Sequence, residues 1–315
     1  MKSGVQSVEK YGQLKAIGLL IGGISSFQIG ATLAKGLFPL FGPTGMVGLR
    51  VCMAALILLA IWRPTRMTLT PAAWKLLLPY GASVAVMNFC FYVALVRLPL
   101  GIVVALEFTG PLTLALTGSR RWLDLCWALF VITGLYLLLR PETTAVTGTL
   151  HHLDLFGICA ALFSGCGWIV YILTGTQMGK VLDAGQATTL GMSTAGILLL
   201  PCLIPTIPTV ITHPWQGGAA LSVAVLSSAV PYILDMMAMR RLKPKDFGIL
   251  LSMEPMLGAI SGWIFLGEGL SAARWVGVLC IVIASLGNVL TAKKVAAHSR
   301  CEQQTPLSLQ APHLR

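Results

Sequence analysis

Charge is scarce in this sequence, and acidic charge is the scarcest. Only 10% of the 315 residues are charged, with 11 Asp and Glu against 22 Lys and Arg, while 56% are hydrophobic. About a quarter of the residues of a typical soluble domain are charged. The composition therefore excludes a water-soluble globular protein, and the mean hydropathy of +0.82 predicts an integral membrane protein.

Motifs of nucleotide and hydrolytic chemistry are also missing. No Gly-rich loop ends in Gly-Lys-Ser/Thr, so we expect no use of ATP by this chain. The patterns Gly-x-Ser-x-Gly and His-Glu-x-x-His are absent, which argues against an intramembrane hydrolase. The eight cysteines form no Cys-x-x-Cys pair, and seven of them sit in apolar runs as small packing residues. We expect no catalytic residue, no metal ion and no cofactor.

The net charge of +11 could fit a nucleic-acid partner, but in a membrane protein it usually reflects topology. Of the 22 basic residues, 17 fall on one side if the N-terminus lies in the cytoplasm. Lys35, Arg97, Arg140 and Arg274 fall on the other side. This strong bias predicts that both termini are cytoplasmic, and we expect no nucleic-acid partner.

Apolar segments of about 20 residues, the length that spans a bilayer, recur throughout the chain. Ten segments qualify: 14–34, 44–61, 74–96, 100–118, 122–139, 153–174, 186–204, 217–239, 247–266 and 272–291. The connections are short and leave no room for a soluble domain. The fold class predicted is an all-α integral membrane protein with ten transmembrane helices.

Two apolar segments each carry one glutamate, six positions after a glycine: Gly101 precedes Glu107, and Gly248 precedes Glu254. These matching copies predict two repeats, at 1–140 and 153–291, followed by a polar cytoplasmic tail at 292–315 that we expect to be disordered. A repeat of five spans is odd in number, so the second copy must cross the membrane in the opposite sense. The prediction is a 5+5 inverted repeat, with a site at the repeat interface near the midplane.

Ionisable side chains inside apolar spans are functional-site candidates by default. Arg50, Glu107, Asp235 and Glu254 are such residues, and we expect at least one of the three acids to be protonated when no cation is bound. Polar or aromatic partners at helical spacing complete the predicted substrate site: Gln28, Asn88, Tyr92, Trp168, Tyr171 and Tyr232.

Their roles follow from the chemistry of a zwitterion, which needs an anion for its ammonium and a donor for its carboxylate. Glu107, Asp235 and Glu254 could supply the first and Arg50 the second, with Glu107 and Glu254 as the proton-coupling pair. Alternatives stay open. Trp168 and Tyr171 could simply pack between helices, Arg50 could be a structural partner of Glu107, and Glu254 could serve a broken helix end.

Several stretches resemble a known family. They are Ala31-Thr32-Leu33-Ala34-Lys35-Gly36-Leu37-Phe38-Pro39, Pro99-Leu100-Gly101, Ala105-Leu106-Glu107-Phe108-Thr109-Gly110-Pro111, Ser252-Met253-Glu254-Pro255 and Phe265-Leu266-Gly267-Glu268. They look like the bacterial threonine/homoserine exporters of the drug/metabolite transporter superfamily, which carry EamA repeats. The likeness covers about 15–291. It implies a ten-helix inner-membrane exporter that releases small amino acids, in exchange for protons.

The function predicted is therefore secondary transport with alternating access, with an amino acid, protons and the lipid bilayer as partners. Within the same class, an exporter of other metabolites or drugs is the alternative. From other classes, an intramembrane enzyme lacks a nucleophile with a base, and a scaffold would not need acids in both halves. Gly18-x-x-x-Gly22 and Gly258-x-x-x-Gly262 have the spacing of helix-packing motifs, so a monomer and a homodimer both remain open.

Overall fold

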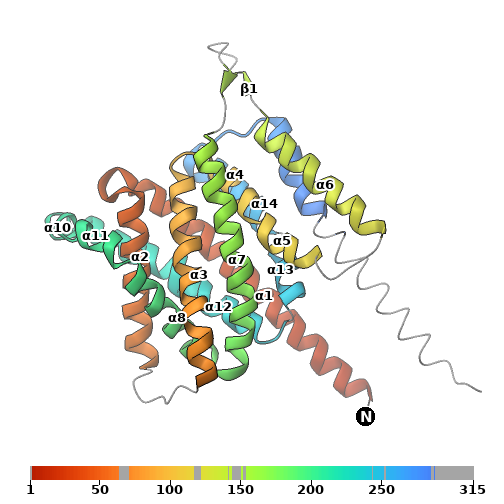
Figure 1. Cartoon of the computed structure of the whole chain (residues 1–315), viewed down its shortest axis with the longest axis horizontal. Helices are drawn as coiled ribbons and strands as arrows, with labels where there is room; N and C mark the ends of the chain where they lie inside the picture. Colours follow the sequence, from red (N-terminus) through yellow and green to blue (C-terminus); the bar gives the residue numbers. More distant parts are fainter. Residues whose placement is uncertain are drawn as a thin grey trace, which may run out of the picture.

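The chain is a bundle of α-helices in the computed structural model (Figure 1). The structure describes residues 2–63, 71–116, 122–140, 142–143, 150–151, 154–242, 244–251, 253–284 and 287. The predicted tail at 292–315 lies outside these residues. A short antiparallel strand pair, β1 (Glu142–Thr143) with β2 (Leu150–His151), is the exception to the all-helical prediction among the described residues.

Long apolar helices form the centre of the bundle. They are α1 (Lys2–Gly36), α2 (Phe38–Trp62), α3 (Pro71–Leu95), α7 (Leu155–Val181), and the continuous run of α11 (Pro214–Ala224), the π-helical η3 (Val225–Ala229) and α12 (Val230–Met239). Five described helices are long and apolar enough to cross a membrane. A sixth candidate is the bent pair Ala184–Leu198 and Leu200–Thr212. These helices support a multi-pass membrane protein.

The bent pair consists of α8 (Ala184–Leu198), α9 (Leu200–Leu203), the 3-10 segment η2 (Ile204–Thr206) and α10 (Ile207–Thr212), and it turns by 59°. Pro201, Pro205 and Pro208 follow one another through the second part. Each proline lacks the N–H that would bond to the residue four positions earlier, so the helix cannot run straight. The predicted continuous span at 186–204 is therefore corrected to a bent one that extends to Thr212.

The two glutamate-bearing segments, predicted as continuous spans at 100–118 and 247–266, both show a break in the helical hydrogen-bond pattern near the glutamate. The first still runs as one helix over Leu100–Leu114 with a local turn at Phe108, whereas the second is interrupted between Leu250 and Met253. The pieces are α4 (Leu100–Glu107) with α5 (Thr109–Leu116), and α13 (Pro244–Leu250) with α14 (Met253–Leu266). Pro111 cannot bond to the carbonyl of Glu107, and Pro255 cannot bond to that of Leu251. Each break falls where a proline four residues later removes a helix hydrogen bond.

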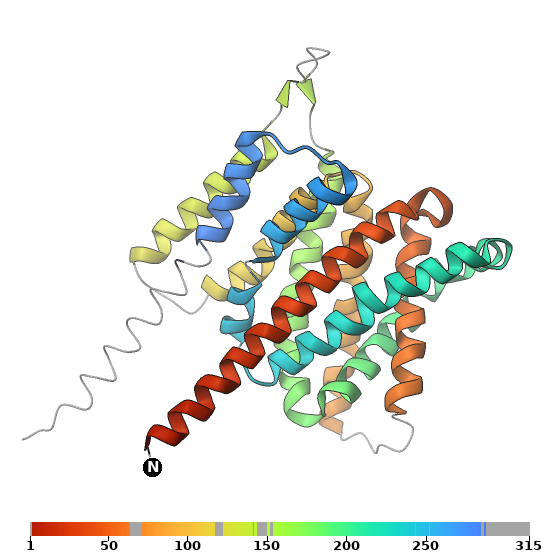
Figure 2. The same ribbon diagram turned by 180° about the vertical axis from the view of Figure 1, so that it is seen from behind.

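Helices from the two halves of the chain interleave. In particular α1 packs against α12, α3 against α7, α2 against α8, α4 against α14 and α5 against α13. Small residues bring α4 and α14 close, since Gly101 faces Ala259 and Gly258 faces Val104. Helix α6 (Trp122–Leu139) pairs with the helix Ala272–Ala284 through Gly134 and Gly277, and Figure 2 shows the two side by side at one flank.

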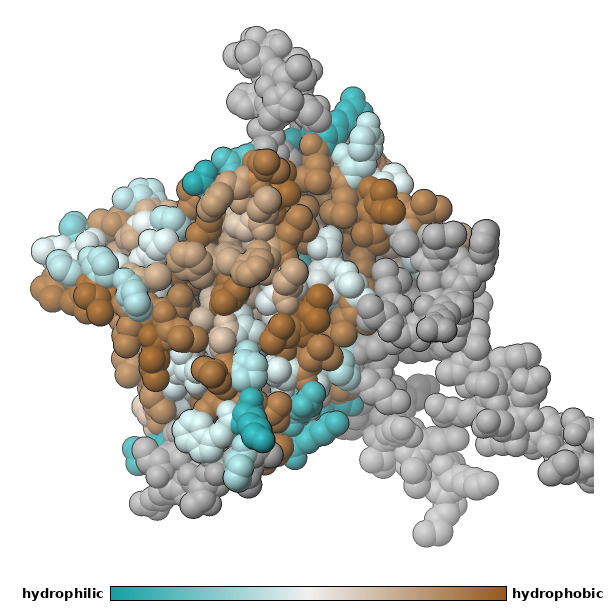
Figure 3. Space-filling view, in the orientation of Figure 1, coloured by the Kyte–Doolittle hydropathy of each residue, from teal (hydrophilic) through white to brown (hydrophobic). Residues whose placement is uncertain are grey.

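The outer surface of the bundle is apolar, as a lipid-facing surface must be. Figure 3 shows hydrophobic side chains over the middle of one face, with hydrophilic ones gathered toward its upper and lower ends. Leu56, Ile132 and Trp263 are among the large apolar side chains that are more than half exposed. An aqueous solvent would penalise such a surface, whereas a bilayer matches it.

Ion pairs tie helix ends together at the predicted outer side. Lys35 at the end of α1 pairs with Glu268, whose Oε2 also accepts the backbone N–H of Leu100 at 2.7 Å. A second pair joins Arg97 to Asp154 at 3.0 Å, and the Arg97 guanidinium lies 4.7 Å from the centre of the Phe156 ring. Asp154 also caps α7 by accepting the Gly157 N–H at 2.8 Å.

This cap gives a pH-dependent contribution to stability. The Gly157 amide first, and then Arg97, lower the pKa of Asp154 below its usual value. A carboxyl with a lower pKa in the folded state stabilises the fold above its unfolded pKa of about 4, and the contribution is lost as pH falls through the folded value. Asp154→Ala should therefore lower the thermal unfolding midpoint of the purified protein at neutral pH, and the difference should shrink in acid.

Arg97→Ala is the matched control, because it removes the ion pair and leaves the Gly157 hydrogen bond. It should lower the midpoint less than Asp154→Ala does. A difference between Asp154→Ala and the parent that stays the same from neutral pH to about pH 3 would contradict the prediction.

Candidate functional site

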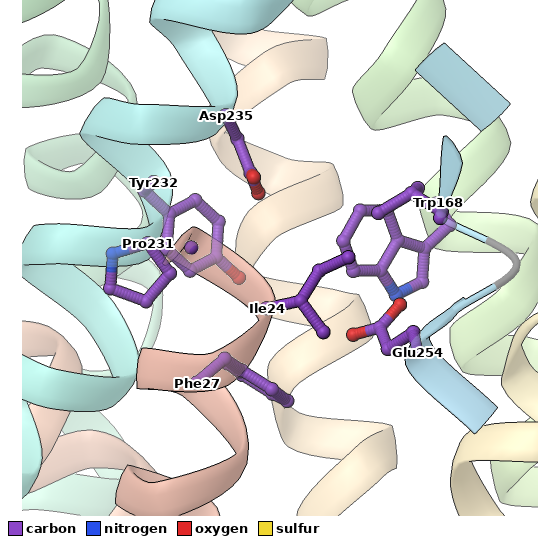
Figure 4. A pocket seen from close by; sticks show the side chains of 9 residues that line it. Ile24, Phe27, Trp168, Pro231, Tyr232, Asp235 and Glu254 are labelled. Atoms are coloured by element: carbon purple, nitrogen blue, oxygen red, sulfur yellow. The ribbon is translucent and has the colours of Figure 1, made fainter. Parts of the chain in front are cut away.

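A small closed cavity lies in the interior, between α1, α7, α12 and the α13–α14 break. Its lining consists of Gly23, Ile24, Phe27, Trp168, Pro231, Tyr232, Asp235, Leu251 and Glu254. Figure 4 shows side chains from these separate helices converging on one space. The cavity volume is about 10 Å³, which is near the smallest space that holds one water molecule. This conformation is closed, and a solute larger than water needs the helices to separate.

Two acidic side chains line this cavity. Asp235 is 6% exposed and Glu254 is 5% exposed. The ion pairs found in the described part of the chain are Lys35 with Glu268 and Arg97 with Asp154, so neither cavity acid has a basic partner there. Two buried carboxyls without a counter-ion attract a cation or hold protons.

Glu107 lies next to the cavity, behind the indole of Trp168. Its Oε1 accepts hydrogen bonds from Trp168 Nε1 at 2.7 Å and from Ser164 Oγ at 2.5 Å. Ser164 and Trp168 are four residues apart on α7, so they share one face of that helix. Trp168 thus separates Glu107 from the space that Glu254 and Asp235 line.

Aromatic rings form the wall of the site. Tyr171 contacts the Trp168 ring edge-on at 5.3 Å, Tyr232 edge-on at 5.6 Å, and stacks on Tyr80 at 5.4 Å. Edge-to-face contacts of this kind favour fixed ring positions. Two of the three aromatic rings that line the cavity, Trp168 and Tyr232, are therefore held by Tyr171.

Arg50 is fully buried and does not line the cavity. Its Nη1 donates to Ser227 O at 2.8 Å, Ser227 Oγ at 3.1 Å and Ser228 Oγ at 2.9 Å. Its Nη2 donates to Asn88 Oδ1, and its guanidinium carbon lies 4.5 Å from the centre of the Tyr92 ring. No described ion pair joins Arg50 to Glu107. Its two Nη atoms thus donate to neutral oxygens of η3 and α3, while no partner is found for Arg50 Nε among the described residues.

Asn88 links this arginine to the cavity. Its Nδ2 donates to Tyr232 Oη at 2.5 Å, while its Oδ1 accepts from Arg50. Because the Tyr232 oxygen already accepts a hydrogen bond from Asn88, its own proton is free to be donated elsewhere. Gln28 Nε2 donates to the backbone carbonyl of Glu254 at 3.5 Å, and no partner is found for Gln28 Oε1 among the described residues.

The ten predicted site residues are all buried. The structure places four of them in the cavity wall: Trp168, Tyr232, Asp235 and Glu254. The other six surround that wall without lining it: Gln28, Arg50, Asn88, Tyr92, Glu107 and Tyr171. That all ten contribute to one substrate site therefore stays a prediction.

Sequence reasoning missed the serines of the site. Ser164 bonds to Glu107, and Ser227 with Ser228 sits in the π-helical segment η3 against Arg50. A signal for the pair was available, because two adjacent hydroxyls precede Pro231 within an apolar span. Short π-helical segments inside α-helices are frequent at functional sites. Ser164 alone carried no such signal.

Known proteins similar to this chain are transporters. The sequence profile of the EamA-like transporter family matches residues 155–290. The threonine/homoserine exporter RhtA of Salmonella typhimurium (strain SL1344) is 42% identical over 277 residues, which cover 88% of this chain and 92% of the relative. RhtA of Escherichia coli (strain K12) is 41% identical over 277 residues, which cover the same fractions of the two chains. The uncharacterized transporter YwfM of Bacillus subtilis (strain 168) is 23% identical over 73% of this chain and 78% of its own.

A solved crystal structure shares the fold, with a TM-score of 0.56 over 92% of this chain and 99% of that chain, at 16% identity. These relatives confirm the resemblance found in the sequence. They also confirm the prediction of a membrane transporter rather than an enzyme.

Proposed function

Because this chain belongs to the EamA-like transporter family, we propose that it exports threonine, homoserine and similar small amino acids across the bacterial inner membrane in exchange for protons. This chain aligns with about nine-tenths of the length of relatives that are named threonine/homoserine exporters, at 41% to 42% identity. The proposal therefore concerns the whole transporter and not an isolated segment. Direction of transport and substrate class come from those relatives, and the cavity chemistry below supports the substrate class.

The topology proposed is ten spans arranged as a 5+5 inverted repeat, with both termini in the cytoplasm. The helix contacts support it. If each helix is exchanged for its counterpart five spans away, the pairing of α1 with α12 becomes that of α7 with α3, and the pairing of α4 with α14 becomes that of α13 with α5. The family match at 155–290 nearly coincides with the second predicted repeat. In this arrangement the cavity lies where the two repeats meet.

The observation that carries the substrate class is a pair of carboxyls beside aromatic rings, Asp235 and Glu254, which have no basic partner among the described residues. An ammonium group is the cation that fits such a site, because carboxylates and the faces of Trp168 and Tyr232 both attract it. The free proton of Tyr232 can serve the carboxylate or hydroxyl of the same substrate. A tight cavity favours amino acids with small side chains.

Exchange for protons follows from charge balance. Two acids in a dry cavity require positive charge, which either protons or a substrate ammonium can supply. Binding of the ammonium from the cytoplasm would release a proton there, and protonation from outside would release the substrate outward. The same pair of acids then serves both steps in alternation.

Labelled threonine uptake into inverted membrane vesicles tests this function. In such vesicles the cytoplasmic face points outward, so an acidic interior should drive threonine inward, and a protonophore should abolish the accumulation. N-acetylthreonine, which lacks the ammonium, should not compete. Accumulation that ignores the pH gradient would refute the antiport, and gradient-driven uptake of cationic drugs without threonine would support the alternative exporter.

We also propose that a single chain contains a complete transport site. Helices from both predicted repeats, α1 from the first and α7, α12 and α14 from the second, supply the lining of the cavity. A homodimer is compatible with this, but transport does not require one.

A further inference from the structure

We infer that the two matching glutamates have different tasks: Glu107 positions the indole of Trp168, whereas Glu254 with Asp235 alternately holds the proton and the substrate's ammonium. This inference rests on the proposed function and refines it. The sequence treats the two glutamates as equivalent, because each follows a glycine by six residues in its own repeat. Their surroundings in the structure are not equivalent.

Glu107 is held by its neighbours through one carboxyl oxygen. One of its oxygens accepts from both Trp168 Nε1 and Ser164 Oγ, at 2.7 and 2.5 Å. Ser164 also lies 2.7 Å from the carbonyl oxygen of Met87, so α3, α4 and α7 meet at this hydroxyl. Glu107 does not line the cavity. A substrate ammonium in the cavity would meet Trp168 before it met this carboxyl.

The backbone around Glu107 leaves no room for movement. A Cβ atom on Gly165 would lie 2.6 Å from the Glu107 carbonyl oxygen, and one on Gly110 would lie 1.9 Å from the Gly165 carbonyl oxygen. On another face of α7, a Cβ on Gly167 would lie 2.9 Å from Met87 of α3. Three glycines thus hold α3, α4–α5 and α7 in direct backbone contact. This close packing holds Glu107 in a fixed position against α7.

Glu254 stands in the opposite situation. It is the second residue of α14, directly after the helix break, and its carboxyl reaches the cavity. The hydrogen bonds described for this residue use its backbone, one to Leu251 O and one from Gln28 Nε2. Figure 4 shows Glu254 and Asp235 approaching the cavity from different helices, with Trp168 beside Glu254. These two carboxyls are free to change partners.

The charged and titratable groups around this pair explain why its charge must be compensated by an exchangeable cation. A negative charge on Glu254 would be repelled by negative charges on Glu107 of α4 and on Asp235 of α12. Asp235 is close to the phenols of Tyr80, Tyr171 and Tyr232. Arg50 is a basic residue near this pair, but its N–H groups donate to Ser227, Ser228 and Asn88 rather than to either carboxyl. A proton or an ammonium must therefore supply the positive charge.

Trp168 is the link between the two tasks. Its Nε1 is bound to Glu107, and its ring forms part of the cavity wall beside Glu254. Without the Glu107 acceptor the indole would be free to rotate, and its N–H would be buried without a partner. The expected consequence is weaker substrate binding and an unchanged response to protons.

The experiment measures threonine transport by purified variants in liposomes, as KM and as the stimulation by an imposed pH gradient. Glu107→Gln keeps an acceptor oxygen for both donors, so its KM and its gradient response should stay near those of the parent. Glu107→Leu and Trp168→Phe each remove the hydrogen bond and should raise KM about tenfold without losing the gradient response. Glu107→Leu combined with Trp168→Phe should be no worse than either change alone.

Glu254→Gln is the contrasting variant. It keeps size and polarity but carries no exchangeable proton, so the stimulation by a pH gradient should fall to the background level. Its KM for threonine should also rise, because the ammonium loses one of its two carboxylates, and a thermal unfolding midpoint near that of the parent shows that the variant is folded. Asp235→Asn should behave in the same way.

Loss of gradient response in Glu107→Gln, or its retention in Glu254→Gln, would overturn the inference. Additive increases in KM from Glu107→Leu and Trp168→Phe would also overturn the positioning role. A parent protein without any gradient response would refute the proposed antiport itself. In that case the KM comparison between Glu107→Gln and Glu107→Leu still tests the positioning of Trp168.

Discussion

Gly110→Ala is expected to prevent stable folding, although it adds a single methyl group. Its Cβ would lie 1.9 Å from the carbonyl oxygen of Gly165 and 2.5 Å from the Gly165 carbonyl carbon. Both atoms belong to the backbone of α7, so no side chain can rotate away. Overpacking of this kind costs about 1 to 3 kcal/mol and occasionally more, and a contact with backbone belongs at the upper end.

Gly18→Ala is the matched control, because no atom lies within 4 Å of its added Cβ. Alanine favours a helix over glycine by about 1 kcal/mol, so this variant should be as stable as the parent or slightly more stable. The measurement is the folded yield after detergent extraction, together with the thermal unfolding midpoint. Equal midpoints for the two variants would show that α5 and α7 are not in backbone contact.

Arg50→Lys is the second change with a large expected effect, even though the positive charge remains. The guanidinium donates to Ser227, Ser228 and Asn88 at once and lies over the Tyr92 ring. A lysine ammonium cannot reach acceptors on both sides with one planar group. Loss of two hydrogen bonds to a charged donor should cost about 3 kcal/mol or more.

Arg63→Lys serves as the control for this substitution. Arg63 is an exposed residue at the end of α2, and its side chain donates to the Ala60 carbonyl at 3.3 Å. It should unfold at the temperature of the parent. If Arg50→Lys also melts like the parent and transports threonine normally, the oxygens of Ser227 and Asn88 do not depend on the guanidinium.

Much of the architecture could be read from hydrophobic runs. The predicted segment at 44–61 lies within α2, and the segment at 122–139 coincides with α6. Periodicity says little about where a helix breaks, so the turn at Phe108 was not predicted, whereas a broken helix end at Glu254 was one of the alternatives left open. Pro111 and Pro255 do carry that information, because each proline removes the bond to the residue four positions earlier.

The site could be predicted only as a set of residue types. A charged or polar residue in an apolar span must face the interior, which holds for Asp235, Glu254 and Arg50. Which of them meet depends on how α1, α7, α12 and α14 pack against one another. Arg50 therefore seemed suited to a substrate carboxylate, whereas its donors are directed at Ser227, Ser228 and Asn88. No sequence spacing encodes a contact across 177 residues, such as that from Arg50 to Ser227.

That long separation has a consequence for biosynthesis. Ribosomes add about 5 to 20 residues per second, so α2 enters the membrane roughly 9 to 35 seconds before Ser227 is made, 177 residues later. Asn88 follows Arg50 by only 38 residues and is available within about 8 seconds. During the interval the nascent chain carries a guanidinium that costs about 2.5 to 3.5 kcal/mol to insert and has few of its final acceptors. The helices made before Ser227 are therefore a dependent intermediate, which reaches its final stability only when Ser227 and Ser228 have been added.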